Sequence, residues 1–153
     1  MPHDFKKFPE LANSQMNEFY WESPHKQITE DFNARVIKIV DGDTIRVETD
    51  FRDFDFPVRL KDIDTKELGE TGALEAALWL RDEILGKEVE ILINTDQRVG
   101  KFGRLIGDVI SMGQSMSQAS LDRGHAIVFG VERDGAIPEN ETLFPSQEVK
   151  KWA

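Results

Sequence analysis

The stretch "RVIKIVDGDTIRVETDF", residues 35–51, decides how this sequence is interpreted. Two runs with alternating apolar side chains flank Asp41-Gly42, and this dipeptide between such runs is a strong signal of a β-hairpin. We assign Gly42 to a turn conformation with positive φ, which glycine adopts without steric cost. Asp43, directly after the turn, has no part in this pattern. It is either a solvated side chain or a carboxylate that the hairpin holds for chemistry.

The residues after the hairpin predict a third strand and then a helix. "FPVRLKDID", residues 56–64, reads as a strand and extends the hairpin into a three-stranded meander. Residues 71–87 predict a helix that Thr71 caps and Gly86 ends. The apolar residues that recur at helical spacing in this segment are Leu74, Ala77, Leu78 and Leu85.

Two more strands and a second helix complete the pattern. "KEVEILINT", residues 87–95, alternates as a half-buried strand does, "GRLIGDVI", residues 103–110, predicts a fifth strand, and "SMSQASLDRG", residues 115–124, predicts a helix. This order of elements is that of a small barrel with helices packed on it. We therefore predict an α+β, mainly β protein, an OB-fold with a five-stranded Greek-key β-barrel and two to three packed helices.

The chain divides into one domain with an extension at each end. Residues 34–130 form the predicted barrel domain. Residues 131–153 form a C-terminal tail, which we interpret as including a short helix packed on the barrel or as irregular. Residues 1–33 form an N-terminal extension whose aromatic residues follow no clean period. We favour an extension that packs these aromatics on the domain surface, and the alternative is a docking segment for a protein partner.

Composition excludes several classes of protein. The 153 residues include no cysteine, so a disulfide framework and a cysteine-based zinc site are both ruled out. No apolar run approaches the length of a membrane span, and the first residues lack the apolar core of a signal peptide. We expect a monomeric cytoplasmic protein with no membrane association. The net charge of −10 argues against a protein that coats DNA, but far less against a metal-dependent enzyme.

Acidic residues at two strand ends suggest a metal site. Asp43 lies next to the hairpin turn, while Asp64 and Glu67 lie where the third strand ends. Neighbouring strands can bring these carboxylates together, and their mutual repulsion then requires a cation such as calcium or magnesium. The alternative is that all three are solvated, because the chain has 29 acidic residues and many lie near turns.

Two arginines favour a site for a phosphodiester. Arg59 lies inside the third strand, and Arg104 lies at the start of the fifth. A pair of guanidinium groups beside a cation can bind phosphate oxygens and offset the charge of a transition state. Alternatively, each arginine forms a structural ion pair. One difficulty is that Arg59 and Asp64 are an odd number of positions apart, so they share a site only if the strand bends, bulges or ends between them.

Three motifs in order resemble the staphylococcal nuclease family. They are "VIKIVDGDTIRV", residues 36–47, "VRLKDIDTKE", residues 58–67, and "DQRVGKFGR", residues 96–104. One such motif is weak evidence, but three in the family order, with suitable elements between them, are highly specific. The resemblance covers roughly residues 34–130 and implies an OB-fold.

The resemblance also implies a calcium-dependent phosphodiesterase that acts on DNA and RNA, with magnesium or manganese as alternative ions. By position, the carboxylates of Asp43 and Asp64 and the backbone carbonyl of Thr65 would be metal ligands. Family members cleave the bond to the 5′ oxygen and leave 3′-phosphates. The remaining roles that the resemblance implies are the following: Glu67 orients or deprotonates the attacking water, Arg59 and Arg104 bind the scissile phosphate, and Lys101 and Phe102 contact substrate.

The sequence also departs from the family pattern. Lys66 stands where the family often has proline, Phe102 replaces the usual tyrosine, and Gly100 stands where an acidic residue is common. None of the six metal-binding and catalytic positions is altered, so these changes bear on affinity and metal choice more than on chemistry. Two alternatives to a nuclease remain open: an OB-fold that has lost catalysis and binds nucleic acid or protein, and an acidic domain that binds only proteins.

Overall fold

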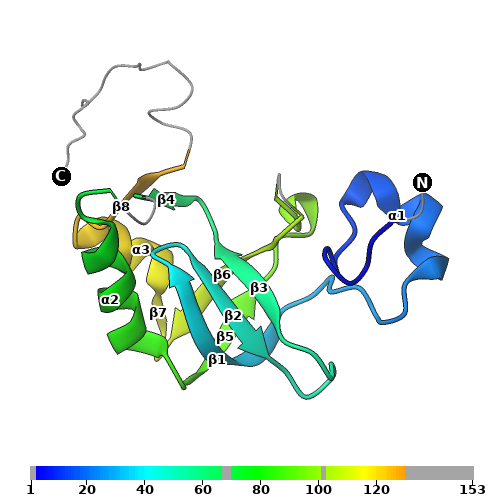
Figure 1. Ribbon diagram of the computed structural model, residues 1–153, viewed down its shortest axis with the longest axis horizontal. Coiled ribbons are helices and arrows are strands. Elements are labelled where there is room, and N and C mark those ends of the chain that lie inside the picture. Colours follow the sequence, from blue (N-terminus) through cyan, green and yellow to red (C-terminus); the bar gives the residue numbers. More distant parts are fainter. Residues whose placement is uncertain (1–2, 67–69, 101–102, 130–153) are drawn as a thin grey trace.

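A computed structural model describes residues 3–66, 70–100 and 103–129 (Figure 1). The predicted tail, residues 131–153, lies outside these residues. No helix within them is long and apolar enough to cross a membrane. In chain order the elements are α1 (Asn13–Phe19), η1 (Tyr20–Glu22), β1 (Phe32–Asp41), β2 (Thr44–Glu48), β3 (Phe56–Leu60), β4 (Ile63–Thr65), α2 (Ala73–Ile84), β5 (Glu88–Leu92), η2 (Thr95–Gln97), β6 (Leu105–Ser111), β7 (Gln114–Ser115), α3 (Met116–Asp122) and β8 (Ala126–Val128).

Five strands close into a barrel in the order β3-β2-β1-β5-β6. The neighbours in this order pair antiparallel, and the barrel closes where β6 pairs in parallel with β3, opposite Val58, Arg59 and Leu60. The short strands β4 and β8 form a separate antiparallel pair. The prediction of a mainly β OB-fold with a five-stranded barrel and up to three helices is confirmed.

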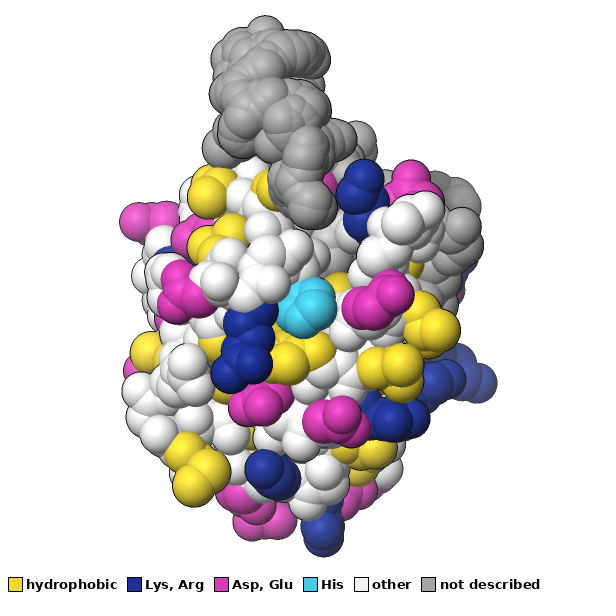
Figure 2. Space-filling model, turned by 90° about the vertical axis from the view of Figure 1, so that its left-hand side faces the viewer, with side chains coloured by type: hydrophobic (Ala, Val, Ile, Leu, Met, Phe, Trp, Pro, Cys, Tyr) yellow, Lys and Arg dark blue, Asp and Glu magenta, His cyan; other side chains and the backbone are white. Residues whose placement is uncertain are grey.

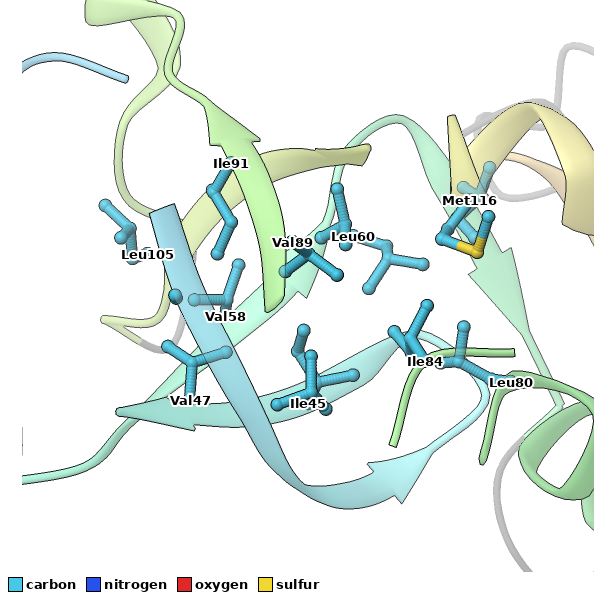
Figure 3. Close-up of a cluster of buried hydrophobic side chains, with 14 of the residues drawn as sticks. Ile45, Val47, Val58, Leu60, Leu80, Ile84, Val89, Ile91, Leu105 and Met116 are labelled. Carbon is cyan, nitrogen blue, oxygen red and sulfur yellow. The ribbon is translucent and has the colours of Figure 1, made fainter. Parts of the chain in front are cut away.

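The core fills the barrel and extends beneath the helices (Figure 3). Alternate residues of each strand point inward, as the pleat of a strand requires. α2 covers one end of the barrel and adds its own apolar side chains to the same cluster. The buried side chains labelled in Figure 3 are Ile45, Val47, Val58, Leu60, Leu80, Ile84, Val89, Ile91, Leu105 and Met116.

The leucines whose spacing predicted α2 do not form its buried face. Leu74, Leu78 and Leu85 are exposed, and the buried face is formed by Ala73, Ala76, Leu80 and Ile84. Both sets follow helical spacing, but small alanines let the helix approach the barrel more closely than leucines do. Figure 2 shows the side of the molecule on which α2 lies, where hydrophobic side chains are scattered among charges of both signs.

The start of α2 also differs from the prediction. The residue at its N-cap is Gly72, with φ of 90°, and Thr71 lies one residue earlier. Glycine adopts this left-handed conformation readily, so the chain enters the helix through a backbone turn, without a hydrogen bond from a capping side chain.

β1 departs from simple alternation at two bulges. Its register with β2 shifts between Val36 and Lys38 and again between Ile39 and Asp41. Each shift leaves one extra residue, Ile37 or Val40, and both of these side chains are partly exposed. A bulge bends the strand that carries it, and beyond the second bulge β1 ends at Asp41, opposite Thr44.

The N-terminal extension, expected to be irregular, contains α1 and η1. No residue of α1 is buried, which explains why this segment shows no apolar period. The segment is held instead by individual side chains on either side of the helix, and Leu11 and Ile28 are both buried. The ring of His25 packs edge-on against Phe54, with ring centroids 5.0 Å apart.

Candidate active site

The hairpin between β1 and β2 turns at Gly42 and Asp43, one residue later than the sequence suggested. Asp41 pairs with Thr44, so Asp43 belongs to the turn itself. Gly42 does not have the positive φ that we predicted. It is required for close approach: a Cβ atom at Gly42 would lie 2.8 Å from Thr65 Oγ1 and 2.9 Å from Ala76 Cβ. The absence of a side chain therefore lets the turn lie directly against β4 and α2.

The Asp43 carboxylate is buried, and both of its oxygens accept hydrogen bonds. Oδ1 accepts a hydrogen bond of 3.1 Å from the Thr44 hydroxyl, and Oδ2 accepts one of 3.1 Å from the Thr65 backbone N–H. Arg59 Nη1 lies 2.8 Å from the same Oδ2. Only 6% of Asp43 is exposed. Of the two interpretations that the sequence left open, a carboxylate held by the hairpin is the one that agrees with this environment.

A reversal of the chain brings Arg59 and Asp64 to the same place. β3 ends at Leu60, Asp62 adopts a left-handed conformation with φ of 64°, and β4 begins at Ile63. The strand therefore ends before Asp64, which removes the difficulty of the odd spacing. Arg59 Nη2 donates a hydrogen bond of 3.0 Å to the Ile63 carbonyl and lies 3.4 Å from Asp64 Oδ1.

Arg104 is linked to the Asp43 carboxylate through Thr44. It directly precedes β6, the strand that closes the barrel beside β3. Its Nη1 donates a hydrogen bond of 3.1 Å to Thr44 Oγ1, and the Thr44 hydroxyl donates in turn to Asp43. Thr44 thus links Arg104 to Asp43, so the two predicted phosphate-binding arginines lie at one end of the barrel.

Asp41 is a member of this cluster that sequence reasoning missed. Burial, the hydrogen bond to the Asp43 side chain and the negative charge of Asp43 together raise the pKa of Asp41 to about 6. Burial also acts to raise the pKa of Asp43, but the hydrogen bond with Asp41, the charge of Arg59 and the Thr65 amide together lower it. Asp43 therefore ionises at a lower pH than Asp41. The signal for Asp41 was present in the spacing Asp41-Gly42-Asp43, but the turn alone explained it.

The donor set fits a hard divalent cation. Asp43 and Asp64 both contact the guanidinium of Arg59, so their carboxylates converge within the span of one side chain. Oxygen ligands of this kind suit calcium, magnesium or manganese. Among the described residues, however, no group of three or more His, Cys, Asp or Glu side chains is arranged to hold a metal. The predicted residues Glu67, Lys101 and Phe102 lie outside the described part of the chain.

Phe129 lies beside the site, next to Arg59. Its ring centroid is 5.4 Å from the Arg59 guanidinium carbon, and its backbone N–H donates a hydrogen bond of 2.8 Å to the Asp62 carbonyl. The Phe129 side chain is more than half exposed. An exposed ring beside an arginine offers a flat apolar face at the edge of the cluster.

Comparison with known proteins supports the resemblance that the motifs indicated. No family model matches this chain. The sequence is 37% identical over 79 residues to a curated relative named micrococcal nuclease, from Shigella flexneri. The match covers 52% of this chain and 42% of that protein, so the chain spans less than half the length of this relative. The match and the five-stranded barrel together confirm the predicted resemblance to the staphylococcal nuclease family.

Proposed function

We propose that this protein is a metal-dependent phosphodiesterase that hydrolyses DNA, RNA or both with little sequence specificity. The observation that carries the proposal is the arrangement of two arginines around the buried carboxylate of Asp43: Arg59 contacts it directly, and the Thr44 hydroxyl links it to Arg104. Two arginines from different strands can bind two oxygens of one phosphodiester. The similarity to a protein named micrococcal nuclease supports this choice over other anionic substrates.

The metal that the resemblance implies would be held by the carboxylates of Asp43 and Asp64 and the carbonyl of Thr65. When bound, a cation of this kind polarises the phosphate and lowers the pKa of a coordinated water. We propose calcium first, with magnesium and manganese as the alternatives. Waters complete the coordination of such ions where the protein supplies few ligands.

The arginines stabilise the negative charge that develops on the phosphate. Arg59 is now shared between Asp43 and Asp64, and a phosphate oxygen would take the place of one of these carboxylates as its partner. Arg104 donates a hydrogen bond to the hydroxyl of Thr44, which orients its guanidinium group. Charged donors that are already in place at the site of developing charge account for much of the rate enhancement in such reactions.

The remaining chemistry is proposed from the resemblance. Glu67 is the candidate for orienting or deprotonating the attacking water, a role that requires it to lie within hydrogen-bond reach of that water. Cleavage of the bond to the 5′ oxygen would leave 3′-phosphates. Phe129 could stack on a base of a single strand next to the phosphate bound at Arg59.

A binding module without catalysis is the second candidate. The observation that favours it is the pairing of Arg59 with both Asp43 and Asp64, which satisfies these carboxylates without a cation. Such an OB-fold would bind nucleic acid or protein through the same surface but would not cleave a phosphodiester bond. The two candidates therefore differ in their response to metal.

Cleavage of end-labelled single-stranded DNA, duplex DNA and RNA separates them. Each substrate is incubated with calcium, magnesium, manganese or chelator, and with the parent protein or the variants Arg59→Ala and Glu67→Gln. Arg46→Ala is the matched control, because Arg46 lies on β2 in an ion pair of 2.8 Å with Asp55 at the surface. Metal-dependent cleavage that only the first two variants lose would establish the enzyme. Binding without cleavage under every metal would establish the module.

A further inference from the structure

The loop that leads to Arg104 is anchored by a buried arginine, Arg98. Its Nε donates a hydrogen bond of 2.7 Å to the Ile28 carbonyl, and its Nη1 donates to the Leu11 carbonyl at 2.9 Å. The Nη1 group also reaches Asn13 Oδ1 at 3.2 Å, and Nη2 lies 2.8 Å from Glu10 Oε1. All four acceptors belong to the N-terminal extension. Only 2% of the Arg98 side chain is exposed, so the anchor is inside the protein.

Glu10 is the counter-charge on which this anchor depends. Its Oε1 accepts hydrogen bonds from Arg98 and from the Ile28 backbone N–H, while its Oε2 contacts the buried Arg52. Burial lowers the pKa of Arg98, and the charge of Glu10 opposes this effect. One buried carboxylate from the extension thus holds two guanidinium groups of the barrel domain. The desolvation of a buried charge is tolerated only with such partners.

The anchor is connected to Arg104 by backbone hydrogen bonds. The Arg98 carbonyl accepts a bond of 2.8 Å from the Ile106 N–H, and the Gly100 N–H donates one of 2.8 Å to the Arg104 carbonyl. Val99 forms a bridge with Leu105 between these two bonds. Residues 98–100 and 104–106 therefore lie side by side, and a displacement of Arg98 moves the backbone from which Arg104 extends.

The extension contacts this loop at two further points. At the start of the loop, Asn13 Nδ2 donates a hydrogen bond of 2.8 Å to the Thr95 carbonyl. Near its end, the ring of Phe8 covers Gly103, where a Cβ atom would lie only 2.5 Å from Phe8 Cδ1. Gly103 also has a φ of 77°, so a side chain is excluded both by conformation and by space. Figure 1 shows the extension, in blue, beside the loop that precedes β6.

We propose that residues 8–28 position residues 95–100 and 103–104, which precede β6, so that Arg104 is presented to a substrate phosphate, with Glu10 and Asn13 as positioning residues. The inference rests on the proposed function for the identity of the substrate. It assigns the extension a part in the site, in place of a role as surface packing or as a docking segment. A loop fixed at Thr95, Arg98 and Gly103 keeps Arg104 in place before substrate arrives, which lowers the cost of binding.

A double-mutant cycle with Arg104 tests this role. Asn13→Ala is the main variant, because it leaves the buried ion pairs of Glu10 in place, and Gln118→Ala is the matched control. Gln118→Ala also removes an amide side chain that donates a hydrogen bond, of 2.9 Å to Asp122, but this bond lies on the exposed surface of α3. Each change is made alone and together with Arg104→Ala. The readouts are the Kd of a phosphorothioate-linked oligothymidylate in calcium and the kcat and KM for cleavage.

We expect Asn13→Ala to weaken oligothymidylate binding by about 3- to 10-fold in the parent and to have no further effect when Arg104 is already replaced. Gln118→Ala should change neither value. A merely structural role would instead weaken binding by the same factor in both backgrounds, which would overturn the inference.

Hydrogen exchange provides a readout that does not depend on activity. The amides of Gly100 and Ile106 should exchange at least about 10-fold faster in Asn13→Ala and Glu10→Gln, while that of Leu60, bonded to the Asp43 carbonyl, is unchanged. Unchanged exchange at Gly100 and Ile106 would refute the positioning role. If the parent neither binds nor cleaves any strand, the proposed function fails, and the exchange rates alone then decide whether the extension holds the loop.

Discussion

Replacement of Gly42 by alanine separates two explanations of why the turn has a glycine. The sequence suggested a positive φ, whereas the structure shows a close approach to Thr65 and Ala76. The backbone of Gly42 lies outside the positive-φ region, so conformation alone does not demand glycine there. If conformation were the only factor, Gly42→Ala would stabilise the protein by about 0.4–1 kcal/mol, because alanine restricts the unfolded chain. The contacts of the folded state predict the opposite sign.

The added Cβ would lie 2.8 Å from Thr65 Oγ1, 2.9 Å from Ala76 Cβ and 3.1 Å from Thr65 Cβ. The Thr65 Oγ1 atom can move by rotation about χ1, but the Cβ atoms of Thr65 and Ala76 are fixed by the backbones of β4 and α2. Overpacking of this kind costs about 1–3 kcal/mol. The turn would be pushed away from β4, which also lengthens the hydrogen bond from the Thr65 N–H to Asp43.

Thermal and urea unfolding, followed by circular dichroism, measure this cost. For a chain of this size, about 2 kcal/mol lowers Tm by roughly 4–8 °C. Thr65→Ala removes the closest contact, and Thr65 Oγ1 has no hydrogen-bond partner among the described residues. The double variant should therefore recover at least about 1 kcal/mol relative to the sum of the single changes. Stabilisation by Gly42→Ala, or additivity with Thr65→Ala, would refute the close-approach explanation.

Three further outcomes are expected. Glu10→Gln leaves the buried guanidinium groups of Arg52 and Arg98 without a counter-charge. It should lower the free energy of unfolding, measured in urea, by about 3–5 kcal/mol. A loss under about 1 kcal/mol would contradict a buried ion pair at Glu10. Burial and the charge of Arg123 lower the pKa of His125 below 6.5, so the folded state binds fewer protons than the unfolded chain. The stability due to His125 is present above pH 6.5 and is lost as pH falls through the folded pKa; His125→Gln should remove this part of the pH dependence of Tm. Arg59→Ala should reduce metal-dependent cleavage at least about 100-fold, while Arg46→Ala stays within about twofold, and equal losses would count against a phosphate site at Arg59.

The barrel could be predicted because each strand carries its own signal. The alternation in β2, β3 and β5 and the turn at Gly42 are local features, and their order along the chain matches the OB-fold. The parallel pairing of β3 with β6 joins segments about 45 residues apart, so no periodicity reports it. This pairing is expected only when the order of all the elements is compared with that of an OB-fold.

The face of α2 shows where periodicity fails. The exposed Leu74, Leu78 and Leu85 also recur at helical spacing, and leucine is more hydrophobic than the alanines on the buried face, so the leucines dominate the pattern. What decides the face is the space beneath the helix, where Gly42 and Ala76 come close together. That space is a property of the assembled barrel and is absent from the sequence of the helix alone.

The sequence indicated several residues of the candidate site but not how the chain brings them together. The structure brings together Asp43, Asp64, Arg59 and Arg104, as expected. Arg59 and Asp64 meet despite their odd spacing because the chain reverses at Asp62, which has a left-handed conformation. Aspartate is one of the few residues other than glycine that adopt this conformation, so the residue type at position 62 is compatible with the reversal. Asp41 was not predicted as a site residue, because its place in the hairpin already explained it.

The extension could not be predicted because its buried contacts are polar. Glutamate and arginine are read from sequence as surface residues, and Glu10 and Arg98 are buried only because they meet each other. Such pairs add little net stability compared with apolar residues, but they are specific, since a shifted segment would bury an unpaired charge. This specificity is what a segment needs if it is to hold a loop in a single position. The buried pair therefore favours a positioning role over general packing, and the cycle of Asn13 with Arg104 puts that distinction to the test.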